Sequence, residues 1–213
     1  MPGRKNISPE LWRRKSRVVE EPRNLRQQQS DDTRRRLLDA SLQLFVHKGF
    51  AGTTVRDIAK AAGVSPGLMF HYFPSKQALL QEHVRVIRSG VDLMAQRLNA
   101  AGDPLETFTE IARTILDSFR ENYSKNLFLL ANQVLSFDSI PRAAKNAVSA
   151  TRSIEASVPL VVRGQRKQQF KRGDPLALVV AFWGALQGIA EVLIWNPNAP
   201  IPDPEVIVAI LRP

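Results

Sequence analysis

The chain has 213 residues, 44% of them hydrophobic, which is enough apolar material for a small domain and a larger one. It contains no cysteine, and this excludes disulfides, thiolate nucleophiles and thiolate metal sites. The formal net charge of +10 is compatible with DNA, RNA or an anionic membrane surface as a partner and does not choose among them.

Residues 1–30 form a basic segment that we expect to be a mostly disordered arm. The segment has eight Lys and Arg against three Glu, and its prolines and the glutamines at 27–29 interrupt helical periodicity. Such an arm either serves solubility alone or follows the phosphates and minor groove of DNA. No secretory hydrophobic stretch follows the charges, so a signal peptide is not predicted.

Two helices are predicted after this arm. The first covers residues 31–49, with Asp31 or Asp32 as its N-cap and Gly49 at its end. The second begins after Thr54, because this hydroxyl and the carboxylate of Asp57 can form a capping box. A glycine at position 63 then ends the second helix in left-handed geometry.

A third helix of about two turns is predicted over residues 65–73. Ser65 is its N-cap, and Pro74 disfavours helical geometry at the residue before it. Met69 and Phe73 are four residues apart and therefore face inward together. The outward groups are unusual for a soluble helix, since exposed apolar and aromatic side chains need a partner and a helix N-terminus attracts anions. These outward residues are Pro66, Gly67, Leu68, Phe70 and His71.

This pattern indicates a helix-turn-helix that enters a DNA groove. Charge supports it, because residues 1–80 hold 15 of the 30 Lys and Arg but only 7 of the 20 Asp and Glu. The alternative is a capped helical hairpin of a bundle that binds no ligand.

The run from residue 33 to residue 80 resembles, without a gap, the DNA-binding domain of the TetR family of transcriptional regulators. The shared features are KGF at 48–50, the threonine pair at 53–54, IA at 58–59, GVS at 63–65 and the aromatic end with FPSK at 73–76. The resemblance implies an all-α fold. A helix-turn-helix domain would cover residues 31–78, and a helical ligand-binding and dimerisation domain would cover residues 79–213.

The resemblance also implies which residues contact DNA. Arg56 would reach a base edge, where its guanidinium can donate two parallel bonds to guanine. Leu68 stands where many relatives have a small polar residue, which favours contact with a thymine methyl group. Phe70 stands where a phosphate-binding tyrosine is common. The complete predicted set is Thr54, Arg56, Ser65, Pro66, Gly67, Leu68, Phe70, His71, Tyr72 and Lys76, with the last two on phosphates.

The remainder of the chain has helical patterns and no strand alternation or internal repeat. Helices are predicted over residues 77–100, 104–122, 125–137 and 142–170, with a kink or break at Pro159.

Residues 176–194 are apolar apart from Gln187 and Glu191 and are long enough to span a bilayer. A carboxylate is costly in lipid and no other membrane pattern is present, so a buried helix in water is the preferred interpretation. With a helix over residues 203–211, it is predicted to form half of a four-helix homodimer interface. Two recognition helices one DNA turn apart would then require a palindromic operator.

No catalytic or metal-binding arrangement is apparent, so neither an enzyme nor a cofactor is predicted. The three histidines lack ligand spacing, and there is no phosphate-binding glycine motif. A ligand pocket is predicted to use Phe119, Gln133, Phe137, Trp183 and Gln187, with ordinary core packing as the alternative for each.

The sequence thus predicts a cytoplasmic, nucleoid-associated, dimeric transcriptional repressor that binds double-stranded DNA. A small apolar or amphipathic effector would release it from its operator. The alternative is a ligand-free DNA-binding organiser whose second domain recruits a protein partner.

Overall fold

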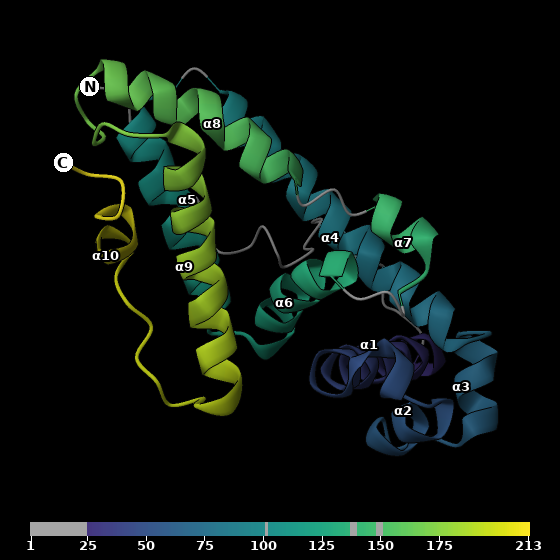
Figure 1. The fold of residues 1–213 in the computed structure, drawn as a ribbon. Helices are drawn as coiled ribbons and strands as arrows, with labels where there is room; N and C mark the ends of the chain where they lie inside the picture. The colour runs from purple at the N-terminus through teal and green to yellow at the C-terminus, as the bar shows by residue number, and fades with distance from the viewer. Residues whose placement is uncertain (1–24, 101, 137–139, 148–150) are drawn as a thin grey trace.

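The computed structural model describes residues 25–100, 102–136, 140–147 and 151–213. The fold is all-α, as predicted. A long helix, α4, joins the α1–α3 head to a second group of helices around α5, α8, α9 and α10 (Figure 1). The helices are α1 (Leu25–Gly52), α2 (Val55–Ala61), α3 (Pro66–Tyr72), α4 (Lys76–Asn99), α5 (Pro104–Ser118), α6 (Asn122–Ser136), α7 (Arg142–Ala147), α8 (Thr151–Arg166), α9 (Pro175–Trp195) and α10 (Pro204–Val208).

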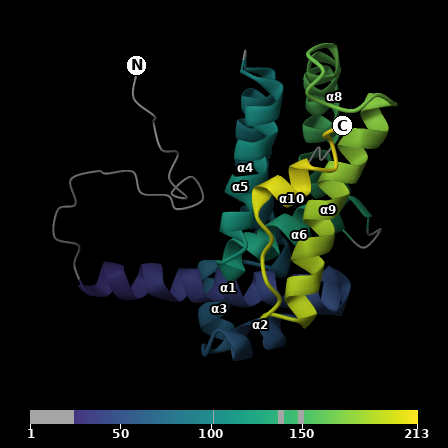
Figure 2. The ribbon, with the colours of Figure 1, turned by 90° about the vertical axis from the view of Figure 1, so that its left-hand side faces the viewer.

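The first helix begins earlier than predicted, and Gly49 interrupts it at the predicted end with a φ of +75°. It is already helical at Leu25, so Asp31 and Asp32 lie inside it and are not its N-cap. Both carboxylates find partners one turn away, Asp31 with Gln27 and Asp32 with Arg35, and such pairs stabilise a helix. Residues 25–30 are therefore helical and not part of a disordered arm, and α1 projects beyond the rest of the head (Figure 2). The rest of the predicted arm, residues 1–24, lies outside the described residues.

Two apolar clusters form the core. The first unites α1, α2, α3 and the start of α4, and it also includes Leu127, Leu130 and Val134 of α6. The second unites the end of α4 with α5, α8, α9 and α10. α6 therefore packs directly on α1 and joins the core of the head.

The helices after α4 begin and end partly where predicted. α5 ends at Ser118, a few residues before the predicted end. α6 includes residues 125–136 of the helix predicted over 125–137 and starts earlier, while residue 137 lies outside the described residues. The single helix predicted over residues 142–170 is two helices, α7 and α8. The prediction of a break at Pro159 was wrong, because α8 continues through this residue. Pro159 is on the exposed side of α8, where water can satisfy the carbonyl group that loses its helical partner.

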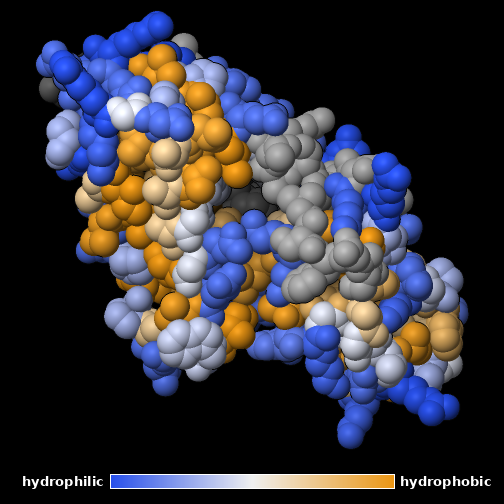
Figure 3. All heavy atoms as spheres, in the orientation of Figure 1, coloured by the Kyte–Doolittle hydropathy of each residue, from blue (hydrophilic) through white to orange (hydrophobic). Residues whose placement is uncertain are grey.

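The apolar helix α9 is long enough, with a mean hydropathy of 1.9, to cross a membrane by length and composition alone. Buried core helices of soluble proteins can have the same length and composition. One face of α9 is buried in the second cluster through Val179, Phe182 and Leu186. The opposite face is exposed, with Leu176 at 49% and Val180 at 52%, and it lies in the apolar region seen in Figure 3. This face is the largest unpartnered apolar feature of α9.

The last helix is shorter than predicted. α10 has five residues instead of the nine predicted over residues 203–211, and Asp203 makes no side-chain capping bond. Its apolar residues Ile207, Val208 and Leu211 are buried against the same subunit, where α10 packs on α5 and α9. Val206 is the large apolar residue of α10 that stays exposed, at 60%, so this short helix offers a second copy a single large apolar side chain.

Gly164 in α8 packs so closely on Phe170 that it has no room for a side chain. A Cβ atom at this position would lie 2.1 Å from Cδ2 of Phe170, whose ring packs edgewise on Phe108. We expect Gly164→Ala to lower the free energy of unfolding by about 1–3 kcal/mol, because the added methyl must displace a buried ring. Gly52→Ala at the end of α1 is the matched control, since its added methyl makes only an ordinary contact, 3.8 Å from Cβ of Lys48. Equal urea midpoints for the two variants would contradict this prediction.

Candidate nucleic-acid interface and interior cavity

The start of α2 is held by a capping box at Thr54, as predicted. The Thr54 hydroxyl accepts from the amide N of Asp57 at 3.1 Å, and the Thr54 amide donates to Oδ2 of Asp57 at 3.1 Å. The Thr54 hydroxyl also donates to Oδ2 of Asp57 at 2.9 Å. The two bonds that this carboxylate accepts, the one from the Thr54 amide first, lower the pKa of Asp57 below its ordinary value. The cap fixes the direction of α2, which presents Arg56 to solvent. Arg56 has no hydrogen bond or ion pair within the described ranges, so its guanidinium is available to a ligand.

The turn between α2 and α3 depends on Gly63. Its φ of +65° lies in the left-handed region, as predicted, and the amide of Val64 bonds back to the carbonyl of Ala59 at 3.0 Å. Arg36 of α1 donates from Nη1 to the carbonyl oxygen of Ala62 at 3.1 Å. The end of α2 is thereby tied to α1, and the angle between α2 and α3 is set.

α3 has one buried side and one exposed side. Ser65 accepts from the amide of Leu68 at 3.1 Å, and Pro66 occupies the first turn. Met69 is fully buried, whereas Leu68 and Phe70 are 41% and 51% exposed. The predicted outward residues Ser65, Pro66, Gly67, Leu68, Phe70 and His71 are all exposed. A short helix with so many small and apolar groups in solvent offers a surface shaped for another molecule.

The two predicted phosphate contacts lie deeper than the others. Tyr72 is half-buried, and its hydroxyl donates to Oγ of Ser30 at 3.2 Å, which connects α3 to the projecting start of α1. Lys76 donates from Nζ to the carbonyl oxygens of Phe50 and Thr53, both at 2.8 Å. Lys76 therefore stabilises the corner between α1 and α2, a role that its sequence context did not suggest.

Sequence reasoning also missed two arginines that assemble the head. Besides Arg36, Arg34 of α1 pairs with Glu82 of α4 at 3.1 Å, and its guanidinium lies 5.2 Å from the centre of the Phe73 ring. Their partners are 26 to 48 residues away along the chain, so no local pattern indicates them. The positive charge of residues 1–80 was taken as support for DNA binding, but Arg34 and Arg36 hold the head together.

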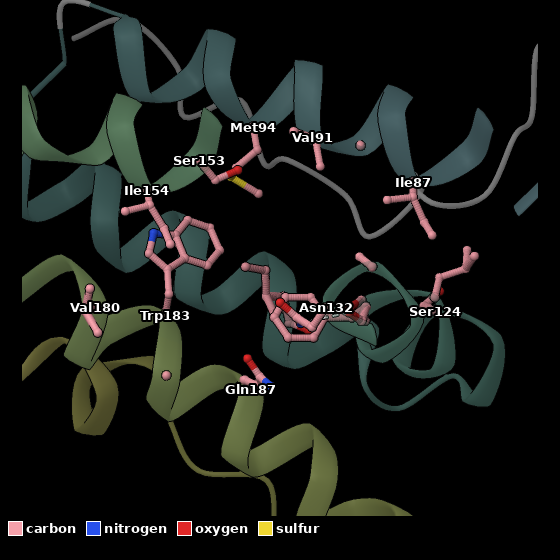
Figure 4. A pocket seen from close by; sticks show the side chains of 17 residues that line it. Ile87, Val91, Met94, Ser124, Asn132, Ser153, Ile154, Val180, Trp183 and Gln187 are labelled. Atoms are coloured by element: carbon pink, nitrogen blue, oxygen red, sulfur yellow. Dashed lines mark hydrogen bonds between the residues drawn. The ribbon is translucent and has the colours of Figure 1, made fainter. Parts of the chain in front are cut away.

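The second domain contains a cavity of about 260 Å³ between α4, α5, α6, α8 and α9. Figure 4 shows that Met94 of α4, Asn132 of α6 and Trp183 of α9 border this space. Trp183 and Gln187 line the cavity as predicted for a pocket.

Two other predicted pocket residues do not line the cavity. Phe119 is buried in the second cluster and packs edgewise on Phe128, while Gln133 donates to the carbonyl oxygen of Val46 of α1 at 3.2 Å. Phe137 lies outside the described residues. The lining from α4 and α6 was missed because helical periodicity shows which side chains turn inward but not where the interior is empty.

The match to known families is concentrated in the head. Residues 37–83 match the family model described as bacterial regulatory proteins, tetR family. The chain is 34% identical over 93 residues to the HTH-type transcriptional regulator AcrR of Shigella flexneri, a match that covers 43% of each protein. It is 29% identical over 162 residues to the HTH-type transcriptional regulator RutR of Escherichia coli, covering 73% of this chain and 72% of that protein. The chain thus spans less than half of the first relative and about seven tenths of the second.

The fold of both domains recurs in solved structures. The TetR family transcriptional regulator PfmR from Thermus thermophilus matches with a TM-score of 0.60 at 24% identity. That match covers 83% of this chain and 97% of the solved one. The helix-turn-helix domain therefore belongs to the TetR family of bacterial transcriptional regulators, and the chain has the helical fold of a solved regulator of that family.

Proposed function

We propose that the protein is a dimeric repressor that reads a palindromic operator through α3 and is released by a small ligand in the second domain. The observation that carries the proposal is the division of α3 into a buried side at Met69 and an exposed, uncharged reading side from Ser65 to His71. Small groups at a helix start permit close approach to DNA, while Arg56 on α2 supplies a guanidinium beside them. As a DNA-binding regulator, the protein would act in the cytoplasm on the nucleoid.

The direct test is a mobility shift with DNA that flanks the gene, in the presence of excess unrelated DNA. A discrete complex that survives competition supports an operator nearby. Equal displacement by any DNA would leave only non-specific binding and would contradict the proposal.

Arg56 provides the sharper test of base reading. We expect Arg56→Ala to reduce discrimination at one base pair by about 1–3 kcal/mol, because a bidentate contact to guanine is lost. Lys76→Ala should instead weaken binding to every DNA sequence to a similar degree. If the Lys76 ammonium contacts a phosphate, the affinity of the variant should also depend less on salt. Since Lys76 also holds the α1–α2 corner, its variant needs a parallel unfolding measurement. An Arg56→Ala protein with unchanged preference among operator variants would contradict the assigned role.

We propose that dimerisation uses the exposed face of α9, with α8 beside it, rather than α10. Along this face run Ala177, Ala181, Gly184 and Gly188, and a Cβ added at either glycine meets no atom within 4 Å. Small residues of this kind allow a second helix to approach closely. The neighbouring Leu176 and Val180 would then leave water.

A charge on this face should separate the subunits. We expect Ala181→Glu to be a monomer by light scattering at micromolar concentration, because its carboxylate would be buried at the interface without a partner. Ala209→Glu is the matched control, as Ala209 is also exposed but lies at the end of α10. A dimer that persists in Ala181→Glu would exclude this face.

The alternative of a ligand-free organiser that recruits a protein partner is less favoured. A fully packed second domain would suit an organiser, whereas the 260 Å³ cavity gives a ligand a place to bind. Contact between the cavity and α4, the helix that begins at the head, offers a route by which a ligand can change the spacing of two heads.

A further inference from the structure

Among the residues that the structure describes, the lining of the cavity contains no charged side chain. The lining residues are aliphatic, aromatic, methionine, serine, glycine or neutral amide, contributed by α4, α5, α6, α8 and α9. An ion buried without a partner is strongly unfavourable. A ligand that enters this space therefore carries no charge on the part that is enclosed.

Lys125 and Glu191 are two charged groups close to the lining, and both are directed elsewhere. Lys125 follows Ser124, but its ammonium donates to Oδ1 of Asn122 at 3.2 Å and to the carbonyl oxygen of Leu193 at 3.3 Å. Glu191 is exposed and accepts a hydrogen bond from Nε2 of Gln187 at 3.0 Å. Neither group is part of the lining, so neither compensates an anion or a cation inside it.

One wall of the cavity is a fixed aromatic ring. Nε1 of Trp183 donates to Oγ of Ser157 at 3.1 Å, and this hydroxyl is itself completely buried and donates to the carbonyl oxygen of Ser153 at 2.6 Å. The indole is thus held in place before a ligand arrives, and Figure 4 shows the Trp183 ring at the edge of this space. On α6, Phe128 also lines the cavity, with its ring packed edgewise on Phe119 at 5.2 Å. Rigid aromatic walls favour a flat ring system.

A few neutral hydrogen-bonding groups accompany these rings. The side chains of Ser124 and Ser153 are buried at the lining, and neither hydroxyl has a hydrogen bond within the part of the chain that the structure describes. A hydroxyl group without a partner in an apolar space gains from a ligand group that can donate or accept. The volume of about 260 Å³ is also below the range of roughly 300–1,000 Å³ for pockets of drug-sized ligands.

We propose that the effector is an uncharged molecule of one or two rings that packs against Trp183 and forms a neutral hydrogen bond with Ser124 or Ser153. The proposal rests on the function proposed above, in which this cavity is the effector site. It narrows the expected apolar or amphipathic effector to one without a carboxylate, phosphate or ammonium group inside the cavity.

The test compares two probes that differ in charge. 2-Naphthol is neutral and 2-naphthoate is ionised near neutral pH, and both are titrated calorimetrically into the full-length protein. We expect 2-naphthol to bind about ten-fold or more tightly than 2-naphthoate. In Val91→Phe, which narrows the cavity from α4, 2-naphthol binding should be lost. Leu105→Phe is the matched control, since Leu105 is a half-buried residue of α5 that does not line the cavity.

Ser124→Ala and Ser153→Ala test the hydrogen bond without depending on the larger substitution. At least one of the two variants should bind 2-naphthol more weakly than the wild type does, while its affinity for naphthalene stays unchanged. Preferred binding of 2-naphthoate, or no binding of either probe, would overturn the proposal. Because DNA binding is measured separately by mobility shift, a protein that binds its operator but prefers the anion would disprove only the ligand class. A protein that binds no operator would disprove the repressor function whatever the titrations show.

Discussion

Met69→Ala is expected to lower the free energy of unfolding by about 2–5 kcal/mol and to abolish specific DNA binding. The Met69 side chain is fully buried beneath α3 and is the one residue of this helix with no exposure. Its loss leaves a cavity between α3 and the first cluster, and α3 has only seven residues with which to hold its position. Urea unfolding of the variant and a mobility shift on the same protein measure the two effects.

Leu68→Ala is the matched control for this experiment. Leu68 is adjacent in sequence but 41% exposed, so its truncation should change stability by no more than about 0.5 kcal/mol. DNA affinity should nevertheless fall at sites where Leu68 contacts a thymine methyl. If Met69→Ala were as stable as Leu68→Ala, the packing of α3 on the head would be described incorrectly.

His83 is expected to make stability depend on pH in the acidic range. The ring is completely buried between α1, α4 and α6, and burial lowers its pKa to about 4. Nε2 lies 2.9 Å from Oγ of Ser41, while Nδ1 is buried with no partner, so a proton there has no acceptor. Glu82, the one charged group that opposes the shift, does not compensate for this desolvation.

The direction in which stability changes with pH follows from the protonation of His83 in the folded and unfolded chains. The unfolded chain binds a proton near the ordinary pKa of 6.5, and the folded chain does not until about pH 4, so lowering the pH favours unfolding. The contribution of His83 is complete above pH 6.5 and is lost between pH 6.5 and about 4, on the order of 3 kcal/mol in total.

His83→Gln separates this effect from other titrations. The variant should lose most of the pH dependence of its urea midpoint between about pH 6.5 and 4.5, a range above the ordinary pKa values of most carboxylates. His47→Gln, at an exposed position of α1, should keep the wild-type slope. An unchanged slope in His83→Gln would assign the pH dependence to other groups.

The recognition module could be predicted almost residue by residue. Thr54, Gly63, Ser65 and Pro66 act through neighbours one to four positions away, and the structure confirms their caps and turn. The predicted start of α1 was wrong, although it too was inferred from a local capping pattern. Asp31 resembles an N-cap, but local pairs within the helix extend it back to Leu25, and glutamines and arginines have good helix propensity.

The second domain was predictable as helices but not as a site. Trp183 and Gln187 line the cavity, whereas Gln133 bonds to α1 and Phe119 fills the core. All four lie on, or directly at the end of, helices with an apolar face. Only the distance between helices distinguishes a side chain that borders a space from one that fills it.

By itself, the sequence determined the helical class, the capped turn between α2 and α3 and the family, because each depends on short-range rules of dihedral angle, capping and spacing. The tertiary structure alone decided three things: that Lys76, Arg34 and Arg36 hold the head together, that α6 joins the core of the head, and that an uncharged cavity lies between α4 and α9. These depend on residues that are far apart in the sequence, such as Arg34 and Glu82, which are brought together by packing and leave no periodic signal along the chain.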